Sequence, residues 1–385
     1  MAGGTKGQRQ QIEEEMELKV LYNADGIKIP MGILSDRNNY NVFKYDPDFA
    51  AKKINVCPLF SAQENTAVNG TENMLPCLFW DLLPSGFNSE VLYKLKQDSI
   101  PLLKKLAMCG QNAIGALEFE PAFPYQYSAE PLNLDEIEAD IRIERNLGRQ
   151  FRLSVGVGGH TPKIAVKVSK DKTEVVEQTE QEHFFDWLVK LPSAVTNPRD
   201  GAAEYIYTKM AKNAGIDVPR VHLFDSETTA GYFGCKRFDR KKNTKKHVVT
   251  IGALMNKNYK TETISLADYV TITQKIAPKE IENLLRLLMF NLKTGNDDIR
   301  GTGISFVLEN NTDWVLAPAY DLVPFSLEAD YTPKMLKKGY EKDETDAVIY
   351  DLCEFAGFAF EKVPAMIEQV ESAVAEYTEL SVDLR

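Results

Sequence analysis

The chain begins with alternating apolar and polar residues, a pattern typical of paired β-strands. Leu18, Val20 and Tyr22 alternate with polar neighbours, and the turn-forming segment 23–26 separates them from the apolar segment 29–34. Alternation with a period of two predicts strands, and the short turn between the two segments predicts a hairpin. The N-terminal part of the chain is therefore expected to be rich in strands.

The apolar spacing changes after this hairpin. Between 74 and 106 leucines recur at longer intervals, which predicts short helices that close the first unit. The highly charged segment 130–149 is interpreted as a boundary. A second strand-rich region is expected to begin at Phe151, with alternation over 164–168 and a further apolar run over 184–191. These segments predict a small antiparallel sheet.

One helix is expected to interrupt this sheet. Segment 202–214 contains no glycine or proline, and it stops at Gly215, a residue suited to a left-handed helix terminus. Strand-like alternation resumes over 218–223, and 231–238 is a further strand candidate. The second region is therefore predicted to combine a sheet with a single helix.

The last third of the chain has a mainly helical pattern. Pro278 stands where a first helical residue tolerates proline, and large apolar residues then recur at spacings of three and four as far as Gly295. This helix should be deeply buried. Two strands are predicted after it, near 304–306 and 314–317, and an amphipathic helix is predicted over 367–377.

Length and patterning together predict three units. A chain of 385 residues exceeds the roughly 250–300 residues at which one hydrophobic core stops growing. We place a first unit at 1–145, a second unit, a sheet with one helix, at 146–248 and a third, helical unit at 249–385.

Composition excludes several classes of protein. Lys and Arg number 45 against 56 Asp and Glu, and the net charge of −11 repels nucleic acid and anionic membranes, so autonomous nucleic-acid binding is not expected. No segment reaches the roughly 20 apolar residues of a membrane span, and residues 1–15 lack a signal-peptide core, which predicts a cytoplasmic protein. The five separated cysteines are interpreted as reduced packing residues. The basic run 240–247 is interpreted as a solvated loop, the alternative being contact with phosphate or an acidic partner.

Candidate chemistry starts at three glycines. Gly156, Gly158 and Gly159 form a flexible turn whose backbone N–H groups are able to approach phosphate oxygens, although an ordinary hairpin turn fits the same residues. Lys163 follows at once, at the start of a predicted strand. Lys190 lies on the next strong strand, where its ammonium needs a counter-charge.

Carboxylates far along the chain supply the rest of this chemistry. Glu204, on the predicted helix, and ATP phosphates would satisfy Lys190, the alternative being an edge lysine that reaches solvent. Asn296, Asp297 and Asp298 follow the buried helix, and Asp321 follows the last strand pair. One carboxylate can accept a hydroxyl proton while another holds Mg²⁺, whereas helix caps are the alternative interpretation. Glycine loop, lysine, glutamate and two acidic sites occur in the order that phosphoryl-transfer kinases use.

Motifs along nearly the whole chain resemble the HipA family of bacterial serine/threonine kinase toxins. The most specific are Gly295-Asn296-Asp297-Asp298 and the segment from Leu316 to Leu322, and shorter ones occur in family order at 43–47, 79–84, 115–117, 159–163, 189–193, 203–205, 214–219 and 237–240. The resemblance implies an α+β, protein kinase-like bilobal fold. Its parts would be a strand-rich N-terminal subdomain, a kinase N-lobe and a helical C-terminal lobe with the catalytic loop.

The resemblance also implies roles and partners. Lys190 would contact the ATP phosphates, Asp298 would be the catalytic base and Asp321 would ligate Mg²⁺. The segment 235–238, with Lys236 and Phe238, would form the hinge that faces adenine. A HipB-like helix-turn-helix antitoxin and a protein substrate of the translation machinery are the implied partners, and growth arrest is the implied outcome.

Departures from the family pattern fall at the active loop. The family continues Asp-x-His-x-Lys-Asn, whereas Asp298 is followed by Ile299-Arg300-Gly301-Thr302-Gly303. The metal-binding asparagine is replaced by Gly303, so water, Asn296 or Asp297 would have to complete the Mg²⁺ shell. Arg300 is a candidate electrostatic clamp on the γ-phosphate.

The glycine loop also differs, because Gly156 replaces an autophosphorylated serine. Ser154 or Thr161 would then have to accept a regulatory phosphate. Three hypotheses follow from these departures: an active kinase, a pseudokinase that binds nucleotide or a partner without transfer, and a kinase for a small molecule or lipid.

Overall fold

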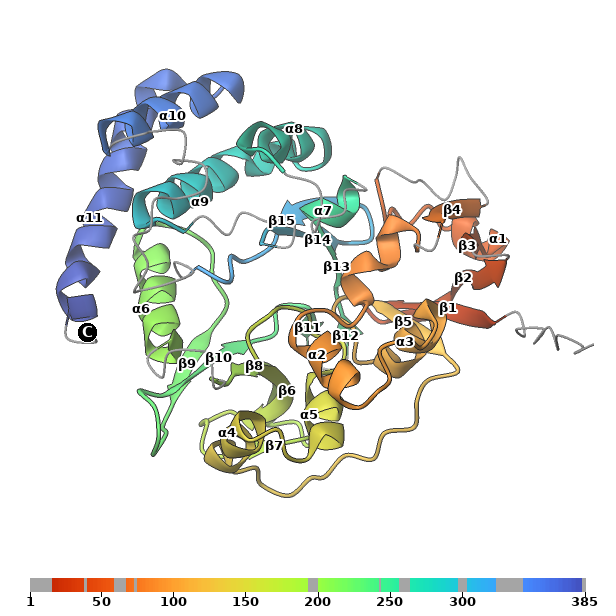
Figure 1. Cartoon of the computed structure of the whole chain (residues 1–385). Coiled ribbons are helices and arrows are strands. Elements are labelled where there is room, and N and C mark those ends of the chain that lie inside the picture. The colour runs from red at the N-terminus through yellow and green to blue at the C-terminus, as the bar shows by residue number, and fades with distance from the viewer. Residues whose placement is uncertain are drawn as a thin grey trace, which may run out of the picture.

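The computed structural model describes residues 16–37, 40–58, 67–72, 75–192, 200–241, 244–255, 264–296, 303–322 and 342–382. The described chain is an α+β structure with a main hydrophobic core that runs from Leu18 to Ala373 and a small second cluster of Val248, Val307 and Ala317. In Figure 1 the N-terminal sheet lies on the right and helices α6, α9 and α11 lie on the left.

The first sheet is built around the predicted hairpin. It has the antiparallel order β4-β3-β2-β1-β5, and the hairpin turn uses Asp25 and Gly26 with positive φ. Leu18, Val20 and Tyr22 are buried, as their alternation predicted. We use the name N-terminal unit for these strands and the short helices beside them: β1 (Glu17–Ala24), β2 (Ile27–Arg37), β3 (Tyr40–Tyr45), α1 (Pro47–Ala51), β4 (Ala67–Glu72), η1 (Cys77–Leu82), α2 (Phe87–Lys94), α3 (Leu102–Cys109) and β5 (Leu117–Glu120).

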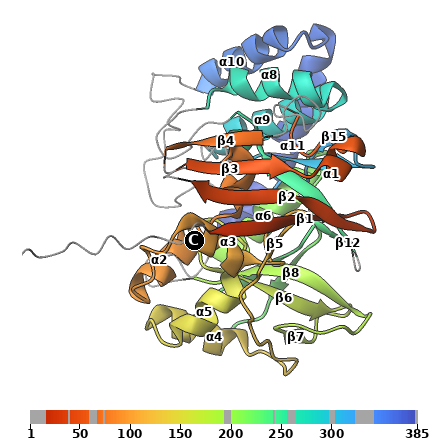
Figure 2. The same ribbon diagram turned by 90° about the vertical axis from the view of Figure 1, so that its right-hand side faces the viewer.

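The second sheet is the predicted small antiparallel sheet with one helix. Its order is β7-β6-β8-β10-β9, and α6 (Asp200–Asn213) connects β8 to β9 and ends before Gly215, whose φ is +82°. The strands are β6 (Lys163–Ser169), β7 (Val175–Val176), β8 (Phe184–Lys190), β9 (Val221–Phe224) and β10 (Tyr232–Lys236). Figure 2 shows β6 and β8 below the N-terminal sheet.

The predicted strand start at Phe151 is wrong. Residues 134–154 form α4 (Leu134–Arg142) and α5 (Leu147–Ser154), and the strand begins only at Lys163. The Asn133 side chain caps α4 by accepting hydrogen bonds from the backbone N–H groups of residues 135 and 136. The charged segment is therefore folded helix, because its acidic residues have local partners such as Arg142 for Glu138 and Arg145 for Asp140.

The remaining strands and helices follow the predicted order. A third sheet, β13-β14-β15, is antiparallel, and α9 ends at Gly295 with φ +69° as expected. Pro278 begins a short 3₁₀ helix before α9 rather than α9 itself. The elements are β13 (His247–Thr250), α7 (Ile251–Leu254), α8 (Leu266–Ile276), η2 (Pro278–Glu280), α9 (Ile281–Thr294), β14 (Ser305–Glu309), β15 (Asp313–Leu316), α10 (Lys342–Phe355), η4 (Phe360–Lys362) and α11 (Val363–Val382).

The basic run is not a solvated loop. It forms the hairpin β11 (Arg240–Lys241) and β12 (Thr244–Lys245). The first and last residues of the hairpin, Arg240 and Lys245, contact the N-terminal unit. Lys245 pairs with Glu118 at 2.6 Å, and Arg240 donates hydrogen bonds to the carbonyl oxygens of Ala113 (2.8 Å) and Gly115 (3.1 Å). The interpretation failed because the carboxylate partner lies more than a hundred residues away in sequence.

Asp81 joins the N-terminal unit to the start of α7. Its carboxylate accepts hydrogen bonds from the Thr250 backbone N–H (2.9 Å) and hydroxyl (2.8 Å). Burial nevertheless raises the pKa of Asp81 to about 6, because the two hydrogen bonds do not offset the lost hydration of the charged form.

Asp81→Asn is expected to stabilise the fold near neutral pH. Because the folded pKa lies above the unfolded value of about 3.9, the contribution of Asp81 to stability is complete below that pH and is lost as the pH rises through about 6. Asparagine still accepts from the Thr250 N–H and does not ionise. Urea midpoints of both proteins should diverge in favour of the variant as the pH rises, and a difference independent of pH would contradict this account.

Candidate functional site

Strand register places two lysines opposite each other. Lys163 on β6 pairs directly with Lys190 on β8, and the next same-face pair is Ala165 with Leu188. On β10, Cys235 lies opposite Leu188 and therefore shares this face. One face of the sheet thus carries a small apolar area next to two cationic groups. A ligand with a flat apolar part and several negative charges matches that surface.

Lys190 is held by carboxylates from two distant elements. Its ammonium lies 2.6 Å from the Glu204 carboxylate on α6, and it also pairs with Asp321 after β15. Burial would lower the pKa of Lys190, but Asp321 and then Glu204 outweigh burial and raise it above its usual range. Phe233 on β10 places its ring 5.7 Å from the same ammonium. Lys190 is therefore charged and fixed in position.

Lys163 has no comparable partner. Its side chain is buried, and among the residues that the structure describes no carboxylate forms an ion pair with it. Burial lowers the pKa of Lys163, and the nearby Asp321 only partly offsets this effect. A buried ammonium opposite a second ammonium is unfavourable unless an anion lies between them. The donor set therefore suits a polyanion such as a nucleotide phosphate.

Asp321 stands on a backbone that its neighbours fix. Its φ is +53°, and its carbonyl oxygen accepts a hydrogen bond from the side-chain amide of Asn296 (3.2 Å). The preceding Tyr320 stacks on Phe238 with ring centroids 6.0 Å apart. The Asp321 side chain remains 45% exposed, so its carboxylate is accessible to a ligand while it pairs with Lys190.

The glycine loop, residues 155–162, lies between α5 and β6. Gly156 is buried, and its carbonyl oxygen accepts a hydrogen bond from the Ile114 N–H (3.0 Å). A Cβ at Gly159 would overlap the Lys163 ammonium. Within the described chain no acceptor contacts the backbone N–H groups of residues 158–161. Gly158 and Gly159 thus suit an anion-binding backbone, whereas Gly156 serves packing against the N-terminal unit.

Other predicted site residues lie elsewhere. Lys236 places its ammonium 3.6 Å from the ring centroid of Phe185, on the face opposite Lys190, so its side chain does not lie on the sheet face of the paired lysines. Asp297, Asp298 and Arg300 lie outside the described residues, and their roles stay predictions. Ser154 is buried with its hydroxyl donating to Asn88 and to the Gln150 carbonyl, which leaves it inaccessible as a phosphate acceptor in this fold.

Metal ligands are sparse in the described chain. Across its described ranges no three His, Cys, Asp or Glu side chains converge as a metal site. The carboxylates beside Lys190 are those of Glu204 and Asp321, and the Asn296 side chain contacts the Asp321 carbonyl oxygen. Asp321 and Asn296 were both predicted as Mg²⁺ ligands. Oxygen ligands of this kind suit Mg²⁺, which commonly takes one or two protein carboxylates together with substrate phosphates.

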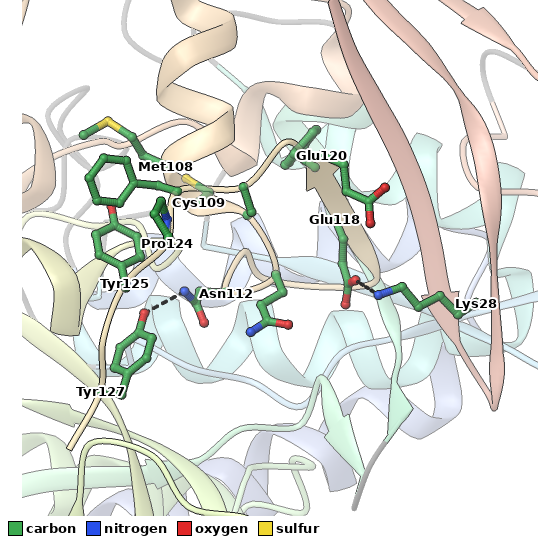
Figure 3. Close-up of a pocket in the computed structure, with 14 residues that line it drawn as sticks. Lys28, Met108, Cys109, Asn112, Glu118, Glu120, Pro124, Tyr125 and Tyr127 are labelled. Atoms are coloured by element: carbon green, nitrogen blue, oxygen red, sulfur yellow. Dashed lines mark hydrogen bonds and ion pairs between the residues drawn. The ribbon is translucent and has the colours of Figure 1, made fainter. Parts of the chain in front are cut away.

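Two cavities lie away from these residues. One of about 240 Å³ opens in the N-terminal unit, where Figure 3 shows Tyr125 and Tyr127 on one side and Glu118 paired with Lys28 on the other. The other, of about 250 Å³, lies between the end of α6 and β15. Neither is lined by the paired lysines, Glu204 or Asp321, so neither belongs to the site.

Sequence reasoning missed two aromatic residues of the site. Phe233 was assigned only to a strand, yet its parity with Cys235 puts it on the face of Lys190. Tyr320 was noted only as the residue before Asp321. Strand parity was the available signal for Phe233, whereas the stacking of Tyr320 on Phe238 depends on tertiary structure alone.

In the part of the chain that the structure covers, no helix combines the length and apolarity needed to cross a bilayer.

Comparisons with known proteins identify the family and the fold. Residues 18–120 match the model of the HipA N-terminal domain, and residues 155–378 match that of the HipA-like C-terminal domain. Among solved structures, the Shewanella oneidensis HipA, HipB and operator DNA complex matches with 18% identity, 93% coverage of this chain, 90% coverage of that chain and a TM-score of 0.70. The Helicobacter pylori proinflammatory kinase CtkA matches with 20% identity over 43% of this chain and 61% of that chain, with a TM-score of 0.31. A search of curated protein sequences found no match.

The two domain models cover most of the chain, and the Shewanella match shows that the fold is that of HipA. The predicted α+β, HipA-like fold is thereby confirmed, and the chain belongs to the HipA family.

Proposed function

We propose that the chain is an ATP- and Mg²⁺-dependent serine/threonine protein kinase of the HipA toxin type. The observation that carries the proposal is the pair of buried Lys163 and half-buried Lys190 at the end of an apolar strand face, with Glu204 and Asp321 beside Lys190. An apolar face suits a purine, and the two ammonium groups suit the phosphates.

Each residue has a stated part in this proposal. Ala165 and Leu188 pack against the base, and the backbone of the hinge segment 235–238 faces its edge. The backbone amides of residues 158–161, which contact no acceptor among the described residues, bind phosphate oxygens together with the lysines. Glu204 orients Lys190.

The acidic groups complete the proposed site. Asp321, helped by Asn296 or Asp297, would hold Mg²⁺, which neutralises charge on the phosphates when bound. Asp298 accepts the proton of the attacking hydroxyl, and Arg300 stabilises charge on the γ-phosphate.

Partners belong to the same proposal. One solved structure similar to this chain is a complex of HipA with HipB and operator DNA, which supports a HipB-like helix-turn-helix antitoxin as a partner. Because the net charge of this chain is −11, contact with DNA would come through that antitoxin. A protein of the translation machinery is the proposed substrate, and growth arrest is the proposed result of its phosphorylation.

Incubation with labelled ATP and Mg²⁺ tests the activity. The native chain should transfer phosphate to itself or to a cell extract, and Asp298→Ala should lose about 10²–10⁴ of the rate because the general base is removed. Gly303→Asn should raise the rate if a missing oxygen ligand limits metal binding. Transfer that is unaffected by Asp298→Ala would contradict the assigned base.

A pseudokinase is the second candidate, and the departures Thr302 and Gly303 favour it. In that case a non-hydrolysable ATP analogue at 100 times its Kd would stabilise the fold by about 2.7 kcal/mol, while no phosphate is transferred. A chain that is neither stabilised by nucleotide nor active would overturn the active kinase and the nucleotide-binding pseudokinase, and would leave a pseudokinase that binds a partner protein. Transfer to a lipid or small molecule instead of protein would favour the third hypothesis.

A further inference from the structure

Residues of the N-terminal unit donate hydrogen bonds to carbonyl oxygens of the glycine loop and of Ser154 just before it. The side-chain amide of Asn88, on α2, donates hydrogen bonds to the carbonyl oxygens of Ser154 (2.8 Å) and Val157 (2.6 Å). Its oxygen accepts a hydrogen bond from the Ser154 hydroxyl. Asn88 is only 1% exposed, so these bonds form in a dry environment where each is strong.

Two backbone contacts act beside Asn88. The Phe87 N–H donates to the carbonyl oxygen of Gly159 (3.1 Å), and the Ile114 N–H donates to that of Gly156 (3.0 Å). A Cβ at Gly86 would overlap the same Gly159 carbonyl, which shows how closely α2 approaches the loop. Figures 1 and 2 both show α2 beside α5, the helix that leads into the loop.

The carbonyl groups and the N–H groups of the loop backbone therefore have different surroundings. Carbonyl groups at 154, 156, 157 and 159 are bound by the N-terminal unit, whereas the N–H groups of 158–161 contact no acceptor in the described ranges. A short run of unpaired N–H groups is a backbone arrangement that binds anions. The conformation of this run of N–H groups depends on the residues that bind the carbonyl groups of the same loop.

We propose that Asn88 is a positioning residue for the phosphates. It fixes the glycine loop in the conformation that leaves the amides of residues 158–161 available, and it does so without touching the ligand itself. This inference rests on the proposed nucleotide site. It adds that the N-terminal unit contributes a determinant of phosphate affinity through one buried side chain.

Calorimetric titration with a non-hydrolysable ATP analogue plus Mg²⁺, and separately with adenosine, tests the inference in the full chain. Asn88→Asp replaces two donors by an anion facing two carbonyl oxygens, so the Kd for the analogue should rise about tenfold while that for adenosine stays unchanged. Ser154→Ala removes only the hydroxyl contact and should shift the ratio of the two Kd values less, in the same direction.

Gln150→Glu is the matched control. Gln150 is also buried and also donates two hydrogen bonds to carbonyl oxygens, those of Asp140 (3.0 Å) and Arg145 (2.7 Å), but neither belongs to the glycine loop. Its ratio of Kd values should remain that of the native chain. A shift as large as that of Asn88→Asp would show that general loosening of the fold is responsible and would overturn the inference.

The remaining outcomes are distinct. Equal weakening of both ligands by Asn88→Asp, or no weakening at all, would overturn the positioning role while the nucleotide site stands. A native chain that binds neither ligand would overturn the proposed function, and the inference with it. If Asn88→Asp does not fold, Ser154→Ala decides, and an unchanged ratio in that variant would overturn the role.

Discussion

Lys190→Met is expected to lower nucleotide-dependent activity by about 10²–10³-fold, because it removes the one ammonium that joins Glu204, Asp321 and the proposed phosphate site. The same change leaves Glu204 buried without its cation. Removing one partner of a buried ion pair costs about 3–5 kcal/mol, so the variant should also be less stable. Transfer from labelled ATP and the urea midpoint measure the two effects.

A double variant separates these two losses. Burial raises the pKa of Glu204 despite the attraction of Lys190, so neutralising the carboxyl removes the penalty that the single change creates. Lys190→Met with Glu204→Gln should therefore recover much of the urea midpoint and none of the activity. If the double variant regained activity, or if Lys190→Met bound the ATP analogue as tightly as the native chain, the assigned role of Lys190 would be wrong.

Asp239→Asn is expected to destabilise the chain by about 3–5 kcal/mol, since two buried guanidinium groups would lose their shared carboxylate. Asp239 pairs with Arg237 at 2.7 Å and with Arg240 at 2.6 Å, and it accepts a hydrogen bond from the Gly115 N–H at 2.8 Å. The asparagine oxygen can still accept from Gly115, but it carries no charge. The urea midpoint of the variant should fall accordingly.

The stability that Asp239 contributes should depend on pH in a definite direction. Arg237 and Arg240 outweigh burial and hold the pKa of Asp239 well below its usual range. Its stabilising contribution is therefore complete above the unfolded pKa of about 3.9 and is lost as the pH falls toward the folded pKa. The difference in urea midpoint between the native chain and Asp239→Asn should become smaller as the pH falls. Asp351→Asn, at an exposed position on α10, is the control and should change stability little at any pH.

Local patterns predicted the elements that depend on local chemistry. The hairpin at 23–26, the helix that ends at Gly215 and the buried helix that ends at Gly295 were all found, because turn glycines and apolar periodicity are encoded within a few residues. The pairing of Lys190 with Glu204 was also anticipated, because glycine loop, lysine, glutamate and acidic sites occur in the order that phosphoryl-transfer kinases use. The direct contact of Lys190 with Asp321 depends on tertiary structure.

The errors share a physical cause, which is dependence on distant partners. Arg240 and Lys245 looked solvated because the backbone oxygens and the carboxylate that bury them belong to the N-terminal unit. The roles proposed for Gly156 and Lys236 stay predictions. The Gly156 carbonyl oxygen accepts a hydrogen bond from Ile114, and the Lys236 side chain lies on the face of Phe185, both through contacts with distant segments. None of these contacts leaves a trace in the neighbouring sequence.

The hydrogen bonds from α2 and Ile114 to the loop before β6 affect whether the two family domains can be separated. The part of the chain that matches the C-terminal domain model begins at residue 155, within the segment that these hydrogen bonds hold. A fragment cut there would keep the paired lysines but lose the side chain and backbone amides that shape the loop beside them. The hydrogen bonds that shape the loop therefore cross the boundary between the two family domains, and moving either domain alone into another protein would remove them.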